Sequence, residues 1–264
     1  MIVYKTEAEI EAMKTAAGIV AAVLDELRPL VKPGVRTSDL DAFAERRARE
    51  LGAKPAFKGY RGYPASLCVS VNEEVIHGIP SDHRILREGD IVSLDFGAFA
   101  GGFYSDAART YPVGRISLLA ERLIAAAERS FTEGFAQLVE GRRLSDISAA
   151  VQRSVEAEGF SVIRAFVGHG IGQDLHEEPQ VPNFGFPGRG PRLRRGLVLA
   201  IEPMIAAGDW DVEVLPDGWT AVTKDRSLAA HFEETVALTG AGAEVLSRNA
   251  GSVGRAAAKE LSNA

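Results

Sequence analysis

The sequence contains one cysteine, Cys68, among 264 residues. A single cysteine forms no disulfide within the chain, and it cannot supply the thiolate cluster that binds structural zinc or an iron–sulfur centre. Any metal site in this protein must therefore use oxygen and imidazole ligands.

The sequence also lacks an excess of positive charge. Lys and Arg number 30 against 36 Asp and Glu, which gives a formal net charge of −6. Binding to phosphates needs a field of basic side chains, so this balance argues against a specific nucleic-acid-binding protein. The chain has a basic cluster in a segment rich in Gly and Pro, where we expect a solvated turn; its members are Arg189, Arg192, Arg194 and Arg195.

Long apolar runs are missing as well. No run is long enough to span a bilayer, and Lys5, Glu7 and Glu9 occupy the region where a secretory signal needs apolar side chains. We therefore expect a cytoplasmic protein without membrane segments. Hydrophobic residues nevertheless make up 46% of the chain, which is typical of a globular protein and excludes a disordered one.

Local patterns predict helices and short strands. Thr6 and Glu9 form a capping box ahead of apolar residues at helical spacing, and Pro33 and Gly34 end this first helix. A second helix begins near residue 37 and ends at Gly52, a residue suited to the left-handed position after a helix. Strands are predicted over residues 67–71, 91–96, 103–111, 197–201 and 232–238, and further helices over about 116–139 and 145–158.

The second half of the chain repeats a pattern of the first. One constant shift superposes Gly34, Arg36, Ser38, Asp39, Ala42, Arg46 and Gly52 on Gly141, Arg143, Ser145, Asp146, Ala149, Arg153 and Gly159. Chance similarity between two amphipathic helices is one explanation. Because the same order of helices and strands follows in each half, we favour an α+β fold, with halves of about 1–112 and 113–264 packed into one domain, 1–264, around a shared site.

Two aspartates lie in a predicted β-hairpin. If the turn is centred on Ala100 and Gly101, Asp95 pairs directly with Asp106 on one face, with Cβ atoms about 5 Å apart. Opposed carboxylates on apolar strands repel each other, so a positive group should lie between them. A loop of different length would stagger the pair and leave each aspartate to cap a turn.

Three further segments place ionisable residues among apolar ones. His169 lies in the glycine-rich segment Gly168–Gly172, where we expect a tight turn that brings the imidazole close to a centre. Glu202 follows an apolar strand, where an unpaired carboxylate is costly and needs a cation or a proton. Alternation puts His231 and Glu233 on one face of the last strand, although either glutamate could lie at a sheet edge.

Together these segments supply four carboxylates and one imidazole, namely Asp95, Asp106, His169, Glu202 and Glu233. Four negative charges match two divalent ions, and hard oxygen ligands with one nitrogen suit manganese, iron(II), cobalt or zinc. Two such ions about 3.5 to 4 Å apart can hold a bridging hydroxide and polarise a carbonyl, which is the machinery of an aminopeptidase.

Further motifs complete an ordered set along essentially the whole chain: Val31–Gly34, Val71–Pro80, Gly168–Gly172, His176–Pro179, Ile201–Pro203, Asp217–Thr220 and Phe232–Glu233. With the hairpin, this set closely resembles type I methionine aminopeptidases, the bacterial pita-bread-fold enzymes that remove the initiator methionine. The absence of a long insertion in the second half fits type I rather than type II. The resemblance implies a pita-bread fold with two pseudo-symmetric halves around a dinuclear metal site.

The resemblance also implies roles for individual residues. Asp95 would bind one metal, Asp106 and Glu233 would bridge both, and His169 and Glu202 would complete the shell of the other. His77 would lie near the scissile amide nitrogen, and His176 near the carbonyl oxygen where negative charge develops. Glu202 would also carry a proton from the attacking water to the leaving amine.

By the same resemblance, a methionine pocket is lined by Phe57, Tyr60, Tyr63, Cys68 and Trp219, together with His77 and His176. Core packing is the alternative role for the first five. Leu175 stands where many relatives have Phe, and Phe57 is larger than the usual small residue, so a reshaped pocket is expected. Glu234 replaces a frequent His and is expected to alter the surroundings of the metal ligands.

The implied substrate is the N-terminal methionine of nascent polypeptides whose second residue is small and uncharged. An Xaa-Pro aminopeptidase or prolidase uses the same metal ligands, but those enzymes usually carry a separate N-terminal domain for which we expect no room here. A non-catalytic pita-bread binding protein generally lacks ligands, whereas all five are present. We expect a monomer, and a transient association with ribosomes through the basic loop 189–195.

Overall fold

The structure, a computed structural model, describes residues 1–248; the last part of the predicted domain, 249–264, lies outside the described residues. The chain begins with α1 (Glu7–Leu27), which continues into a 3₁₀ turn at Arg28–Leu30. The predicted capping box is confirmed, since Glu9 N donates to Thr6 Oγ1 over 3.2 Å and Thr6 N donates to the Glu9 carboxylate over 2.8 Å. These bonds satisfy backbone groups that a helix start otherwise leaves unpaired.

The helices α2 (Thr37–Glu50) and α4 (Leu144–Ala157) end in the same way. Gly52 follows the first with φ of 83°, and Gly159 follows the second with φ of 80°. Both values lie in the left-handed region that glycine adopts at low cost after a helix. The matching ends agree with the pattern that the sequence repeats.

The strands among residues 1–248 form a nine-stranded sheet and two three-stranded sheets. The large sheet runs in the order β1-β4-β5-β14-β9-β7-β8, with β2 paired to β4 and β15 paired to β14. Its strands are β1 (Lys54–Pro55), β2 (Leu67–Val71), β4 (Ile91–Ala100), β5 (Phe103–Pro112), β7 (Gly168–Gly170), β8 (Glu177–Val181), β9 (Val198–Ile201), β14 (Glu233–Thr239) and β15 (Gly242–Val245). The small sheets consist of β3 (Glu74–Ile76), β11 (Val212–Val214) and β12 (Ala221–Thr223), and of β6 (Ser161–Val162), β10 (Met204–Ala206) and β13 (Ala229–His231).

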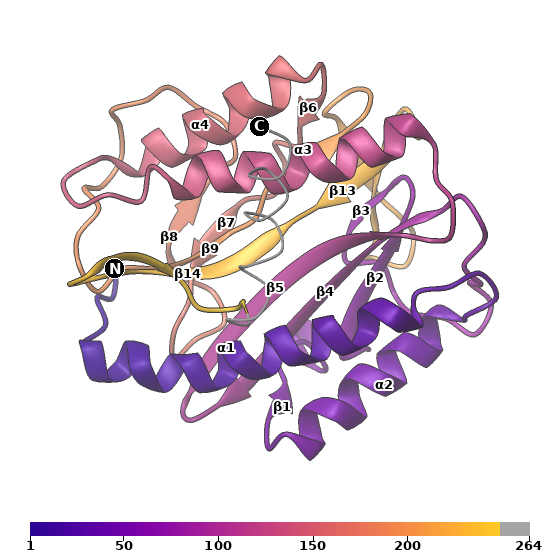
Figure 1. The fold of residues 1–264 in the computed structure, drawn as a ribbon, viewed down its shortest axis with the longest axis horizontal. Helices are drawn as coiled ribbons and strands as arrows, with labels where there is room; N and C mark the ends of the chain where they lie inside the picture. The colour runs from indigo at the N-terminus through magenta and orange to yellow at the C-terminus, as the bar shows by residue number, and fades with distance from the viewer. Residues whose placement is uncertain (249–264) are drawn as a thin grey trace, which may run out of the picture.

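Within residues 1–248, four α-helices lie as two pairs along the large sheet. In Figure 1, α1 and α2 run along the lower part of the view, α3 (Leu118–Phe135) and α4 along the upper part, and the yellow β14 passes between the pairs. Each pair has its own apolar core: Leu27, Leu40 and Phe96 belong to one, and Leu123 and Ile147 to the other. In the large sheet the two halves meet where β5 pairs with β14, and in a small sheet β3 of the first half pairs with β12 of the second. None of the helices within residues 1–248 is long and apolar enough to cross a membrane.

The predicted register of the β4–β5 hairpin is wrong by two residues. Asp95 pairs with Ala108, and Asp106 pairs with Gly97, because the turn is formed by Gly101 and Gly102. Both glycines have positive φ, 62° and 87°, as a two-residue hairpin loop that follows the strand twist requires. Since side chains alternate with a period of two, the shift leaves both aspartates on one face but staggers them.

Candidate active site

One cavity brings together every residue that the sequence predicts to bind metal or substrate. The metal-ligand candidates come from the two halves: Asp95 and Asp106 from the hairpin, and His169, Glu202 and Glu233 from β7, the end of β9 and β14. The cavity is lined by Phe57, Tyr60, Arg61, Tyr63, Cys68, His77, Asp95, Asp106, His169, Leu175, His176, Glu202, Trp219 and Glu233.

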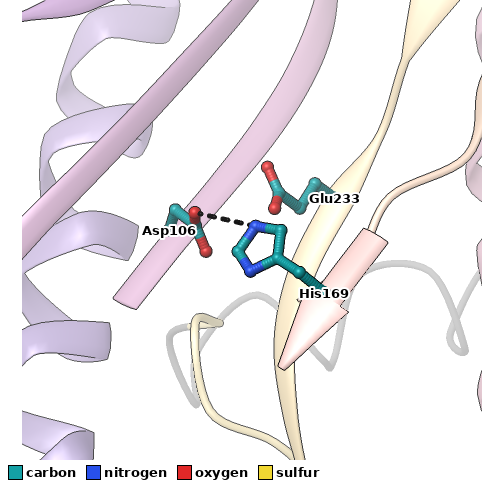
Figure 2. A group of neighbouring side chains, drawn as sticks. All are labelled: Asp106, His169 and Glu233. Carbon is teal, nitrogen blue, oxygen red and sulfur yellow. Dashed lines mark ion pairs between the residues drawn. The ribbon is translucent and has the colours of Figure 1, made fainter. Parts of the chain in front are cut away.

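Among the described residues, Asp106, His169 and Glu233 form a cluster of possible ligand atoms. Figure 2 shows these side chains converging from β5, β7 and β14 of the large sheet, and one ligand atom of each lies within 4.8 Å of the others. The Nε2 atom of His169 is 3.7 Å from Asp106 Oδ2 and 3.7 Å from Glu202 Oε1. These separations exceed hydrogen-bond length, whereas a cation between the atoms would bind each at about 2.0–2.2 Å.

The imidazole of His169 is oriented for metal binding. Its Nδ1 lies 2.9 Å from the carbonyl oxygen of Gly170, which only accepts, so Nδ1 carries the proton and the lone pair of Nε2 faces the carboxylates. The predicted turn at this site is instead the strand β7, paired to both β8 and β9. The flanking glycines allow this close packing, because a Cβ on Gly168 would lie 2.4 Å from the oxygen of Ala200, and one on Gly170 would lie 2.3 Å from that of Glu178.

The carboxylates of the cluster are poorly compensated by protein groups. Burial, followed by repulsion from neighbouring carboxylates, raises the pKa of Asp95, Glu202 and Glu233 well above their usual values. Burial also raises the pKa of Asp106, against the opposing effect of His169. Asp95 Oδ1 and Asp106 Oδ1 are buried without a hydrogen-bond partner among the described residues. Buried oxygens of this kind need a proton or a cation, and the donor set fits a divalent metal.

Two further histidines extend from the cluster into the cavity. His77 directly follows β3 with a φ of 59°, an uncommon conformation for a residue with a side chain, and its ring contacts Phe166 and Trp219 edge-on. His176 lies 4.1 Å from His169 between ring centroids and stacks on Tyr60. Burial lowers the pKa of His77, and it also lowers that of His176 with the help of His169.

The rest of the cavity wall is apolar and aromatic. Tyr63 packs edge-on against Trp219, with 5.2 Å between ring centroids, and its hydroxyl donates to the carbonyl oxygen of Gly78 over 2.9 Å. Cys68 is buried beside Asp95 on the paired strand, and burial raises the pKa of its thiol, so it remains neutral and acts as a small apolar residue. Phe57 fits because residue 97 is glycine: a Cβ there would lie 2.6 Å from the ring.

Sequence reasoning missed Arg61, a cation on the cavity wall. It has a φ of 49° between Gly59 and Gly62, and its guanidinium lies over the Tyr60 ring. No local pattern distinguishes it from a surface arginine. His231, which was expected on the same strand face as Glu233, lies beside the site: its Nε2 is 3.7 Å from Glu202 Oε2 and 4.0 Å from Glu233 Oε2.

Known proteins resemble this chain in sequence, in fold or in both. A methionine aminopeptidase of Clostridium acetobutylicum is 52% identical over 246 residues, which cover 93% of this chain and 98% of that protein. The crystal structure of methionine aminopeptidase from Thermotoga maritima has a TM-score of 0.93 at 48% identity and covers 94% of this chain and 100% of its own. The prolidase from Pyrococcus furiosus, at 22% identity and a TM-score of 0.76, covers 94% of this chain and 66% of its own, and shows the fold alone.

These likenesses confirm the predicted pita-bread fold. A model of metallopeptidase family M24 matches residues 11–240, more than half of the sequence. The chain belongs to metallopeptidase family M24.

Proposed function

We propose that this protein is a methionine aminopeptidase that removes the N-terminal methionine from chains whose second residue is small and uncharged. The observation that carries the proposal is the meeting, in one cavity, of five metal-ligand candidates with an aromatic and apolar pocket. The 52% identity to a methionine aminopeptidase over nearly the full length of both chains supports the same activity.

The proposed centre contains two divalent ions drawn from manganese, iron(II), cobalt and zinc. Asp95 would bind one ion, Asp106 and Glu233 would be shared by both, and His169 and Glu202 would complete the set of residues that holds the second. The unpaired oxygens of Asp95 and Asp106 and the outward lone pair of His169 Nε2 support this assignment. When bound, the two ions activate a water molecule as the nucleophile and polarise the scissile carbonyl.

Three side chains of the cavity handle protons and charge in this proposal. Glu202, whose pKa is raised by burial, accepts a proton from the attacking water and passes it to the leaving amine. His176 donates to the carbonyl oxygen as negative charge develops, an interaction worth about 2.7 to 4 kcal/mol in comparable sites. His77, held in the cavity by its left-handed backbone, contacts the scissile amide nitrogen.

Methionine specificity follows from the pocket of Phe57, Tyr60, Tyr63, Cys68 and Trp219. A thioether packs favourably against ring edges, and the edge-on pair of Tyr63 and Trp219 supplies such a surface. The neutral thiol of Cys68 adds a small apolar contact beside the metal-ligand candidate Asp95.

The test is release of free methionine from a Met-Ala-Ser peptide by chelator-stripped protein, with and without Mn²⁺, Co²⁺ or Fe²⁺. An Xaa-Pro peptide is assayed in parallel, because the prolidases share the fold. We expect metal-restored cleavage of the Met peptide alone. Cleavage of the Xaa-Pro peptide instead would indicate a proline-specific enzyme. No cleavage of either peptide by protein that has bound metal would favour a binding protein.

We further propose that the enzyme works in the cytoplasm, as a monomer, on the N-termini of nascent polypeptides. Transient contact with the ribosome would use the loop at 189–195, in which Arg189, Arg192, Arg194 and Arg195 are all exposed. Neutralising these four arginines should reduce cosedimentation with ribosomes. Unchanged cosedimentation of the neutralised variant would argue against this contact.

A further inference from the structure

A buried ion-pair network lies directly behind the metal-ligand candidate Glu233. The side chain of the next residue, Glu234, is 0% exposed, and both of its carboxylate oxygens are paired. Arg109 Nη2 and Arg248 Nε donate to Glu234 Oε1 over 2.6 and 2.7 Å, and Ser247 Oγ donates to Oε2 over 2.6 Å. Two arginines thus share one carboxylate, which leaves a net positive charge behind the cluster of acidic ligands.

The network lies at the seam between the two halves. Strands β5 and β14 pair over a short register, in which Glu233 faces Ala108 and Glu234 faces Ala107. Arg109 Nη1 donates to the backbone carbonyl oxygens of both Ala108 and Glu233, over 2.8 and 2.5 Å. One guanidinium therefore ties a carbonyl of each strand and the Glu234 carboxylate together, a geometry that needs its planar fork of donors.

The side chains on this seam include both of the proposed bridging ligands. Asp106 stands on β5 and Glu233 on β14, and one ligand atom of each lies within 4.8 Å of His169. Their mutual spacing depends on how closely the two strands approach. A buried ion pair contributes little net stability once desolvation is counted, so geometry is a better reason than stability for so complete a network.

We infer that the Arg109–Glu234–Arg248 network sets the spacing of Asp106 and Glu233, which makes Arg109 and Glu234 positioning residues of the metal centre. The inference rests on the proposed function, because it assumes that these carboxylates bind metal. Through this network, the side chain at position 234 affects metal affinity although it is not proposed to contact substrate. Residues that act on ligands from behind in this way typically change metal affinity by about 10–100-fold.

The decisive variant is Arg109→Lys, which keeps the charge but loses the planar fork. Chelator-stripped full-length protein is titrated with Mn²⁺ by calorimetry, and the unfolding temperature of the metal-free protein is measured beside it. We expect Mn²⁺ to bind about tenfold or more weakly to the variant. Arg47→Lys is the matched control, since Arg47 pairs with Glu26 through two bonds of 2.7 and 3.0 Å between α2 and α1. It should shift only the unfolding temperature.

A second variant keeps the inference testable if Arg109→Lys fails to fold. Glu234→Gln preserves shape but adds one net positive charge behind the site, and it should also weaken Mn²⁺ binding by tenfold or more. Wild-type affinity in both variants, or in the folded Arg109→Lys protein alone, would overturn the positioning role. Failure of the wild-type protein to bind Mn²⁺ would overturn the proposed function itself, and with it this inference.

Discussion

Replacing Tyr60 with Phe tests how the proposed oxyanion donor is oriented. The Tyr60 hydroxyl lies 3.0 Å from Nδ1 of His176, and the two rings stack with 5.3 Å between centroids at an angle of 15°. Because burial and His169 lower the pKa of His176, the imidazole is neutral at pH 7 and carries one proton. A hydroxyl that donates to Nδ1 leaves this proton on Nε2, where it can be donated to the substrate carbonyl.

The expected magnitude follows from the loss of one hydrogen bond. Tyr60→Phe retains the stacked ring and removes only the donor, and a neutral hydrogen bond of this kind contributes about 1 kcal/mol net. At about 1.4 kcal/mol per tenfold change in rate, kcat/KM for Met-Ala-Ser should fall about fivefold. Tyr111→Phe is the control, since its hydroxyl donates to the Leu24 carbonyl oxygen over 3.2 Å outside the cavity. The control should keep wild-type kcat/KM.

A double-mutant cycle separates orientation of His176 from a general effect on the pocket. If Tyr60 acts through His176, then Tyr60→Phe should have no further effect on kcat/KM in a His176→Ala background. The same fivefold loss in that background, or full activity of the single Tyr60→Phe variant, would show that Tyr60 does not act through His176.

Three further predictions follow from the geometry of the site. Asp106→Asn should abolish metal-dependent methionine release and leave the circular dichroism spectrum unchanged; near wild-type activity would contradict the two-metal centre. Gly97→Ala should lower the free energy of unfolding by about 1–3 kcal/mol, since the added Cβ would lie 2.6 Å from the Phe57 ring. Adding Phe57→Ala to this variant should recover part of the lost free energy, as measured by denaturant titration. The pKa values of Asp95, Glu202 and Glu233 are raised, so Mn²⁺ binding should release protons from these carboxyl groups. Calorimetry in buffers of different ionisation enthalpy should detect this release, and the affinity for Mn²⁺ should fall as the pH falls. Binding that is independent of pH between 6 and 8 would argue against these carboxylates as ligands.

Local signals in the sequence predicted the helices and the longer strands, but they missed short strands such as β3, β10 and β12, and α1 ends at Leu27, before the predicted stop at Pro33 and Gly34. The capping box of Thr6 and Glu9 and the glycine that ends α2 depend on neighbours within a few residues, and both appear in the structure as expected. The candidate ligands were also recognisable, because carboxylates beside apolar strands are costly without a counter-charge. All of them line one cavity.

Features that depend on long-range geometry were not predictable. The hairpin register, by contrast, had a local signal: Gly101 and Gly102 both accept the positive φ that this two-residue loop requires, whereas the turn predicted at Ala100 and Gly101 would place Ala100 in that conformation. The prediction that Asp95 and Asp106 lie on one face of the hairpin was unaffected, because a shift of two residues does not change the face on which a side chain lies. Glu234 was noted in the sequence as unusual, but its partners Arg109 and Arg248 lie 125 and 14 residues away and could not be assigned without the fold.

The central claim is that five residues from the two halves hold two metal ions beside a methionine pocket. The most direct measurement is an anomalous difference map from crystals of the Mn²⁺-loaded protein. If these residues bind metal as proposed, two peaks are expected in the cavity, one among Asp106, Glu233 and His169 and the other beside Asp95. Peaks outside this cavity, or none at Asp106 and Glu233 in protein that is active with Mn²⁺, would contradict it.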